Sequence, residues 1–201
     1  MTQRAAIGFK LHTGWAVLVA VAGDPSAIEV LLRRRIELLP PDTSIPRFVY
    51  HQASEMSPKQ AADLVKRAMK AARDAARVAV QDALQELSAR GVTADVCGVL
   101  SGSTVVPNDL AAIVRSHPLI HAAEGALFQS AIVSACESHG MTVTVLRERE
   151  VWVRTAAAWG ITETLLRKRV DGLRESVGAP WSADYKASTA IALLALKSKR
   201  G

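Results

Sequence analysis

The hydrophobic pattern of the first forty residues predicts three β-strands. Two apolar segments, 5–11 and 15–22, are rich in Ile, Val, Phe and Trp and are separated by only three residues. A Gly-Asp-Pro-Ser turn follows at 23–26, and apolar and charged residues then alternate from 28 to 38, which is typical of a strand with one exposed face. The short connections predict an antiparallel meander.

The next part of the chain predicts a loop and then a long helix. Residues 40–56 contain three prolines and show no period, so we expect a loop there, and His51 lies in it without a neighbour that gives it a role. Ser57 is followed by a proline and, three residues on, by a glutamine, which is the pattern of a capped helix start. The alanine-rich helix is expected to run to about residue 90 and to stop at Gly91.

The second half of the chain alternates strands with helices. An apolar strand is expected at 96–100, a helix at 116–139 and another strand at 141–146. Helices are expected over 148–159 and 162–177, with a break at Gly160, and a last helix is expected to begin after Ser182.

Composition bounds the class of protein and of partner. At 201 residues, with 49% hydrophobic and 22% charged residues, the chain can bury a core. Its net charge of +6 makes it a basic protein and permits binding to nucleic acid, whereas 4% aromatic residues are poor material for stacking bases.

Cysteine usage and hydropathy predict a cytoplasmic protein. Cys97 and Cys136 fall in a predicted strand and a predicted helix and form no paired motif, so we expect reduced core residues. The apolar run at 15–22 imitates a secretory leader, but strand-like alternation follows it. No apolar stretch approaches the ~20 residues that a membrane helix needs, so no membrane association is expected.

Two short patches and the element order resemble a known superfamily. Residues 7–10 read Ile-Gly-Phe-Lys and residues 13–17 read Thr-Gly-Trp-Ala-Val. The resolvase branch of the ribonuclease H-like superfamily opens similarly, with Ile-Gly-Ile-Asp and Thr-Gly-Tyr/Trp-Ala-Val. The Asp-Tyr-Lys-Ala segment at 184–187 resembles the last helix of those enzymes, which carries a carboxylate.

This resemblance implies an α/β fold. We expect a single ribonuclease H-like domain over residues 1–201, with an extra helical segment at about 148–177. Its five-stranded mixed sheet, three antiparallel strands and then alternating helix and strand, would be flanked by helices.

The same resemblance implies a degenerate nuclease fold. Those nucleases hold two divalent cations between carboxylates, and such cations want oxygen ligands. Here Lys10 stands at the place of the first-strand acid, and Ser-Gly-Ser follows the strand at 96–100 where a second acid is expected. Asp184 remains, and only Glu148 and Glu150 could supply further acids. We therefore expect a non-nucleolytic or divergent member of uncharacterised function.

The first hypothesis is a ligand or partner site at the carboxyl ends of the strands. Under this topology the first and fourth strands are parallel neighbours, so their ends meet. A small-residue turn with exposed amides beside a lysine can bind an anion. The expected ligand-binding residues are Lys10, His12, Ser101, Gly102, Ser103 and His117, with His121 and Glu124 close by. The sequence does not decide whether the ligand is a small molecule or a protein partner. It also leaves open whether the chain forms a homo-oligomer.

The second hypothesis is an enzyme. His117, His121 and Glu124 lie at i, i+4 and i+7 and share one helix face. Glu124 can orient His121 as the general base of a small hydrolase, or the three side chains can hold zinc, or Glu124 and His121 pair for structural reasons. Among these alternatives zinc is not the preferred one, so no residue is assigned as a metal ligand. The sequence leaves open which cofactor the chain uses and whether it is an enzyme.

The third hypothesis is nucleic-acid binding by the long helix. Four cations gather on the side opposite its apolar face: Lys66, Lys70, Arg73 and Arg77. A solvated outer face explains the same pattern.

Overall fold

A five-stranded mixed sheet forms the centre of the computed structural model, which describes residues 2–39, 44–102 and 104–198. The strands are β1 (Gln3–His12), β2 (Trp15–Asp24), β3 (Ala27–Glu37), β4 (Val92–Ser101) and β5 (Thr142–Arg147), in the order β3-β2-β1-β4-β5. β1, β2 and β3 form the antiparallel meander, and β4 runs parallel to both β1 and β5. The predicted α/β fold, with three antiparallel strands followed by alternating helix and strand, is confirmed.

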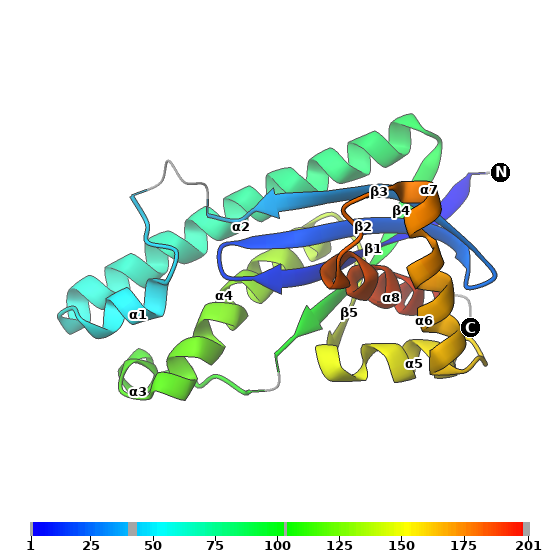
Figure 1. The fold of residues 1–201 in the computed structure, drawn as a ribbon. Coiled ribbons are helices and arrows are strands. Elements are labelled where there is room, and N and C mark those ends of the chain that lie inside the picture. Colours follow the sequence, from blue (N-terminus) through cyan, green and yellow to red (C-terminus); the bar gives the residue numbers. More distant parts are fainter. Residues whose placement is uncertain (1, 40–43, 103, 199–201) are drawn as a thin grey trace.

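Helices cover both faces of this sheet (Figure 1). Helices α2 and α4 pack in one layer, with the short α1 and α3 beside them, and α8 packs on the other face with α5 and α6. The helices are α1 (Val49–Ser54), α2 (Pro58–Ala89), α3 (Leu110–Val114), α4 (His117–Ser138), α5 (Val151–Ala158), α6 (Glu163–Gly172), α7 (Arg174–Val177) and α8 (Ala183–Ser198), with a 3-10 turn, η1 (Glu148–Glu150), before α5.

Two sequence predictions need correction. Residues 49–54 of the expected loop form helix α1, whose Val49, Tyr50 and Ala53 are buried, while residues 40–43 of that loop lie outside the described part of the chain. The helix expected over 162–177 is interrupted at Leu173, so it is seen as α6 and α7. Packing of Val49, Tyr50 and Ala53 into the core accounts for α1.

Two glycines let α8 approach the sheet closely. A Cβ atom on Gly8 would lie 1.9 Å from the backbone oxygen of Ser188, and one on Gly98 would lie 2.5 Å from that of Ile191. No side chain fits at such distances, so glycine at these positions in β1 and β4 fixes the depth at which α8 sits. The depth matters for function because α8 carries Asp184 at its start.

Helix α4 is a core helix. Of the described helices it is the one that is long and apolar enough to cross a membrane by length and composition, but half of its apolar stretch is buried inside the protein. This stretch is longer than the sequence prediction allowed. Packing against α2 accounts for its apolar character, which is equally typical of core helices. Cys136 of α4 and Cys97 of β4 are free and buried against one another, and that contact together with burial raises the pKa of the Cys136 thiol.

Candidate functional site

Two contacts between a basic and an acidic side chain lie at the carboxyl end of β1. Lys10 Nζ forms an ion pair with Glu148 in η1, directly after β5. His12 Nε2 lies 3.0 Å from Asp184 Oδ2 on α8. Lys10 is the more buried partner of its pair, with its side chain 15% exposed against 52% for Glu148. Lys10 and His12 therefore each have a carboxylate partner from the second half of the chain.

Strand alternation explains why these partners meet. Side chains at even positions of β1 point to the α8 face, as Gly8 does, while Ile7 and Phe9 belong to the core on the α2 and α4 face. Lys10 and His12 are therefore turned to the same side as α8. The His12 ring also stacks on Trp15, with 4.0 Å between ring centroids, and this contact fixes its orientation.

A cavity of about 370 Å³ opens beside the first ion pair. It is lined by Ser101 and Gly102 at the end of β4 and by Arg147, Glu148 and Arg149 at the end of β5. Ser101 and Arg147 are partners in the register of these two strands. The predicted strand-end residues Ser101 and Gly102 thus line the same cavity as Glu148, which is the ion-pair partner of Lys10. Ser103 lies outside the described residues.

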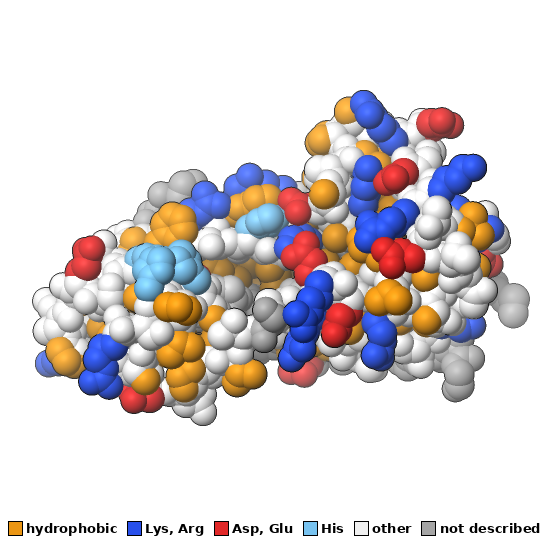
Figure 2. Space-filling model, turned by 60° about the horizontal axis from the view of Figure 1, so that its bottom comes forward, with side chains coloured by type: hydrophobic (Ala, Val, Ile, Leu, Met, Phe, Trp, Pro, Cys, Tyr) orange, Lys and Arg blue, Asp and Glu red, His pale blue; other side chains and the backbone are white. Residues whose placement is uncertain are grey.

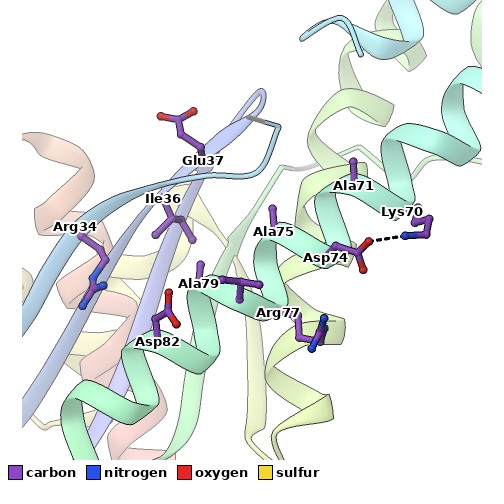
Figure 3. A pocket seen from close by; sticks show the side chains of 11 residues that line it. Arg34, Ile36, Glu37, Lys70, Ala71, Asp74, Ala75, Arg77, Ala79 and Asp82 are labelled. Carbon is purple, nitrogen blue, oxygen red and sulfur yellow. Dashed lines mark hydrogen bonds and ion pairs between the residues drawn. The ribbon is translucent and has the colours of Figure 1, made fainter. Parts of the chain in front are cut away.

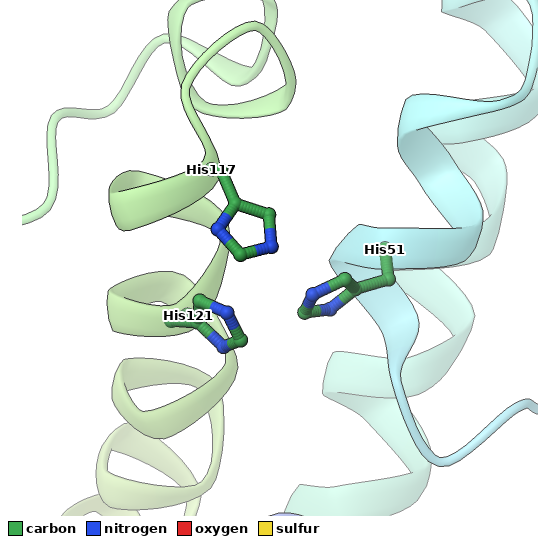
Figure 4. Close-up of side chains that lie close together, drawn as sticks. All are labelled: His51, His117 and His121. Carbon is green, nitrogen blue, oxygen red and sulfur yellow. The ribbon is translucent and has the colours of Figure 1, made fainter.

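Three histidines come together elsewhere. His117 and His121, one turn apart on α4, face His51 of α1, and Figure 4 shows the three rings turned toward one another. The centroids of the rings lie 4.4 Å apart for His117 and His121, 4.8 Å for His51 and His121, and 5.7 Å for His51 and His117. His51 is the functional candidate that sequence reasoning missed, because it stands 66 residues from His117 in a segment expected to be a loop.

Glu124 lies behind this cluster and holds helix α1. It is 2% exposed, and its carboxylate accepts hydrogen bonds from the backbone N–H groups of Val49 (3.2 Å), Tyr50 (2.8 Å) and His51 (3.3 Å). These are orphan donors of the first turn of α1, where negative charge is favoured. Oε1 of Glu124 also lies 3.4 Å from Nδ1 of His51. Burial and, secondly, this carboxylate raise the pKa of Tyr50 above its ordinary value.

The described contacts divide the predicted site into two groups. Lys10 and His12 contact residues on the α8 side, whereas His117, His121 and Glu124 contact α1 on the other side of the sheet. Figure 2 shows a patch of histidine side chains at one end of the molecule, separated by a hollow from an area where acidic and basic side chains are mixed. The expected single pocket that holds all these residues is not what the structure forms.

The four cations predicted for nucleic-acid binding are exposed along α2. Lys70 and Arg77 line a cavity of about 830 Å³ between α2 and β3, shown in Figure 3, and Lys66, Lys70 and Arg73 line a second one of about 640 Å³. Acidic residues stand among them. Lys70 Nζ lies 2.7 Å from Asp74 Oδ2, and this hydrogen bond lowers the pKa of Asp74. The helix face therefore has mixed charge.

Comparison with known proteins gives a fold and no family. No family model and no curated protein matches the chain. Two solved structures of RuvC from Thermus thermophilus are similar. RuvC in complex with a Holliday junction substrate has a TM-score of 0.55 at 17% identity, and a second RuvC structure has 0.56 at 16% identity. Each match covers 98% of this chain and 95% of the other. The chain therefore has the ribonuclease H-like fold that the resolvase RuvC adopts.

Proposed function

We propose that this chain is a non-nucleolytic ribonuclease H-like protein that binds phosphate groups of a nucleic acid at the carboxyl ends of β1, β4 and β5. The observation that carries the proposal is the pairing of Lys10 with Glu148 and of His12 with Asp184. At the place where the resembling nucleases gather carboxylates around metal ions, this chain sets a lysine and a histidine, and each of them contacts one of the carboxylates there.

Metal-dependent cleavage is disfavoured by the charges at this place. Two divalent cations need several carboxylate oxygens that face a common point. Glu148 already binds the ammonium group of Lys10, and Asp184 already bonds to His12. A divalent cation would have to displace the lysine, which is mostly buried, and would then stand beside its positive charge. At an effective dielectric of about 20, a unit charge 4 Å away costs roughly 4 kcal/mol, and a divalent ion roughly doubles that cost.

Binding of phosphate is favoured by the cavity next to this pair. Arg147 and Arg149 present two exposed guanidinium groups there, and Ser101 contributes a hydroxyl group and Gly102 a backbone without a side chain. Guanidinium forks suit phosphate oxygens. The chain carries a net charge of +6, and one of the two similar RuvC structures is described as a complex with a Holliday junction. Branched DNA is therefore the first ligand to try.

The catalytic hypothesis for His121 and Glu124 has less support. A general base must lie within hydrogen-bond reach of its orienting group, and the described hydrogen bonds of Glu124 go to the α1 backbone and to His51. These contacts favour a role for Glu124 in positioning α1.

Fluorescence anisotropy with branched and duplex DNA at several salt concentrations tests the binding. For the wild type, affinity should fall steeply as salt rises, because bound phosphates release counterions. Replacing Arg147 and Arg149 together with alanine should lower the salt slope by about 2, one for each phosphate contact. Arg154→Ala, an exposed arginine of α5, is the matched control and should leave the slope unchanged. Lys66→Ala with Arg73→Ala tests the α2 face in the same titration.

Three results would overturn the proposal. The first is absence of DNA and RNA binding at low salt. The second is loss of binding in the α2 double variant while the Arg147 and Arg149 variant still binds normally, which would move the interface to α2. The third is cleavage of DNA in Mg²⁺ or Mn²⁺ that Asp184→Asn abolishes, which would restore the nuclease that the charge pattern disfavours.

A further inference from the structure

The histidine cluster formed by His51, His117 and His121 has the composition and spacing of a set of metal ligands. One nitrogen from each ring lies within 4.8 Å of the chosen nitrogens of the other two. His117 and His121 are exposed and His51 is half-buried, so solvent reaches the cluster. Three imidazoles in edge-to-face contact would repel one another if protonated, and together they gain most when their lone pairs share one cation.

The backbone supports this arrangement from two helices. His117 and His121 stand at i and i+4 on the first two turns of α4, the spacing at which two histidines on a helix bind one zinc ion. His51 enters from α1, on the facing side of the cluster. The three ligands therefore come from two segments that the chain separates by 66 residues, and a bound ion would join α1 to α4.

Glu124 contacts His51 and is an outer partner of the ligand set. Its carboxylate holds the first N–H groups of α1 and contacts Nδ1 of His51 at 3.4 Å. A proton on that Nδ1 would be donated to Glu124, which leaves the Nε2 lone pair of His51 for a metal. Carboxylate, histidine and metal in this order recur in zinc proteins, where the carboxylate fixes the ring and raises its basicity.

We propose that His51, His117 and His121 bind a divalent transition metal of the zinc class, with Glu124 as the positioning residue. Three neutral nitrogen donors suit Zn²⁺, Co²⁺, Ni²⁺ or Cu²⁺ and are poor ligands for Mg²⁺ or Ca²⁺. With metal-to-nitrogen distances of about 2.0–2.1 Å, tetrahedral ligands stand about 3.3 Å apart. The exposed rings of His117 and His121 close that gap by rotation of their side chains. Because His117 and His121 are exposed, the fourth position would be open to water or an external ligand.

This site is independent of the proposed strand-end interface. It lies on the α1 and α4 side of the sheet, whereas Lys10 and Asp184 face α8. A negative result at one place therefore leaves the other untouched.

Titration of the untagged, metal-free chain with Zn²⁺ and with Co²⁺ tests the proposal. One equivalent should bind, and the visible spectrum of the Co²⁺ form should show a four- or five-coordinate ion with nitrogen ligands. His51→Ala, His117→Ala and His121→Ala should each lower the affinity by at least about a hundredfold, because loss of a direct ligand exceeds the 10–100-fold cost of losing an outer partner. His139→Ala, an exposed histidine that caps the other end of α4, is the matched control and should bind like the wild type.

Further measurements distinguish loss of a metal ligand from loss of the fold. His117 and His121 are exposed, so their alanine variants should keep the circular dichroism spectrum and the unfolding midpoint of the metal-free wild type. Glu124→Gln should lower the affinity by about 10–100-fold while the Co²⁺ spectrum keeps its form. Failure of the wild type to bind Zn²⁺, or equal binding by a variant that lacks all three histidines, would overturn the proposal.

Discussion

The strand-end site and the histidine cluster place their carboxylates differently relative to their basic side chains. At the strand ends the two basic side chains, Lys10 and His12, each contact a carboxylate directly. In the histidine cluster the rings face one another, and the carboxylate that the described contacts place there, Glu124, stands behind them. In the first arrangement each basic side chain has a carboxylate partner, and in the second three imidazole nitrogens lie within 4.8 Å of one another.

This difference teaches where a cation can act. A site whose acids are already paired has little to offer a metal ion, although its arginines can still hold an anion. A site whose acid orients a neutral ligand from the rear is prepared for a metal. In this chain the acids at the strand ends are paired with Lys10 and His12, and the three histidines that could hold a metal lie on the α1 and α4 side of the sheet.

Gly8→Ala separates the two regions by damaging only one. The new Cβ would lie 1.9 Å from the backbone oxygen of Ser188, so α8 must shift, and Asp184 with it. We expect a loss of about 3 kcal/mol in the free energy of unfolding, at the upper end of overpacking effects. Urea denaturation measures the loss. Zn²⁺ affinity of the folded variant should stay unchanged, because the histidines lie on the opposite side of the sheet from α8.

Gly125→Ala is the matched control for this substitution. Gly125 lies in α4 and has nothing within 4 Å of the position of a Cβ atom, so alanine should stabilise the helix by up to about 1 kcal/mol. Equal stability of Gly8→Ala and the wild type would show that α8 does not sit at the depth described.

Glu124→Gln tests the carboxylate behind the histidines. The glutamine amide carries no negative charge and leaves some of the α1 donors poorly satisfied, so unfolding should become easier by about 2 kcal/mol. The pKa of Tyr50 should fall part of the way to its ordinary value, because burial still raises it while the negative charge is gone. Spectrophotometric titration of tyrosinate measures this shift, and Glu137→Gln on the exposed end of α4 is the control.

The direction of the pH dependence follows from the same residue. A tyrosine whose pKa is higher in the folded protein than in the unfolded chain stabilises the fold fully below about pH 10, and that contribution is lost as the pH rises through the folded value. The Glu124→Gln variant has the smaller difference in pKa, so its stability should decline less steeply in that alkaline range. A decline as steep as that of the wild type, or steeper, would mean that Glu124 does not raise the pKa of Tyr50.

Local patterns predicted most of the fold, because strands and helices have distinct periods. The alternation from 28 to 38 and the capping pattern at Ser57 both lie within a few residues of the elements they predict. Local patterns could not predict which side chains contact one another in the site. Lys10 and Glu148 are 138 residues apart, and His12 and Asp184 are 172 apart. Only the tertiary fold brings them together.

One signal for the missed histidine was present in the sequence. Glu124 falls on an apolar stretch of α4 beside Ala123 and Leu127, which are buried. A carboxylate in such a place needs several donors, and one neighbouring histidine, His121, cannot supply them. The donors had to come from another segment, and the start of a helix offers free N–H groups. The loop assignment for residues 40–56 hid that helix, and His51 with it.

Lys10→Asp tests whether the missing acid alone separates this site from a metal centre. The substitution would set three carboxylates at the strand ends, one in place of Lys10 and those of Glu148 and Asp184. Without metal the variant should lose about 1 kcal/mol, the value of a partly exposed ion pair, plus repulsion between like charges. Mg²⁺ or Mn²⁺ should then raise its unfolding temperature and leave that of the wild type unchanged, because binding to the folded state stabilises it by mass action.

Lys10→Met is the matched control, since it removes the charge and keeps the approximate length of the side chain. If Mn²⁺ stabilises Lys10→Asp and not Lys10→Met, charge at this one position decides whether the strand ends hold a cation. Equal stabilisation of the wild type by Mn²⁺ would contradict the comparison between the two regions, because the paired carboxylates would then be available to metal after all. Stabilisation by Zn²⁺ should persist in both of these variants, since its ligands lie on α1 and α4.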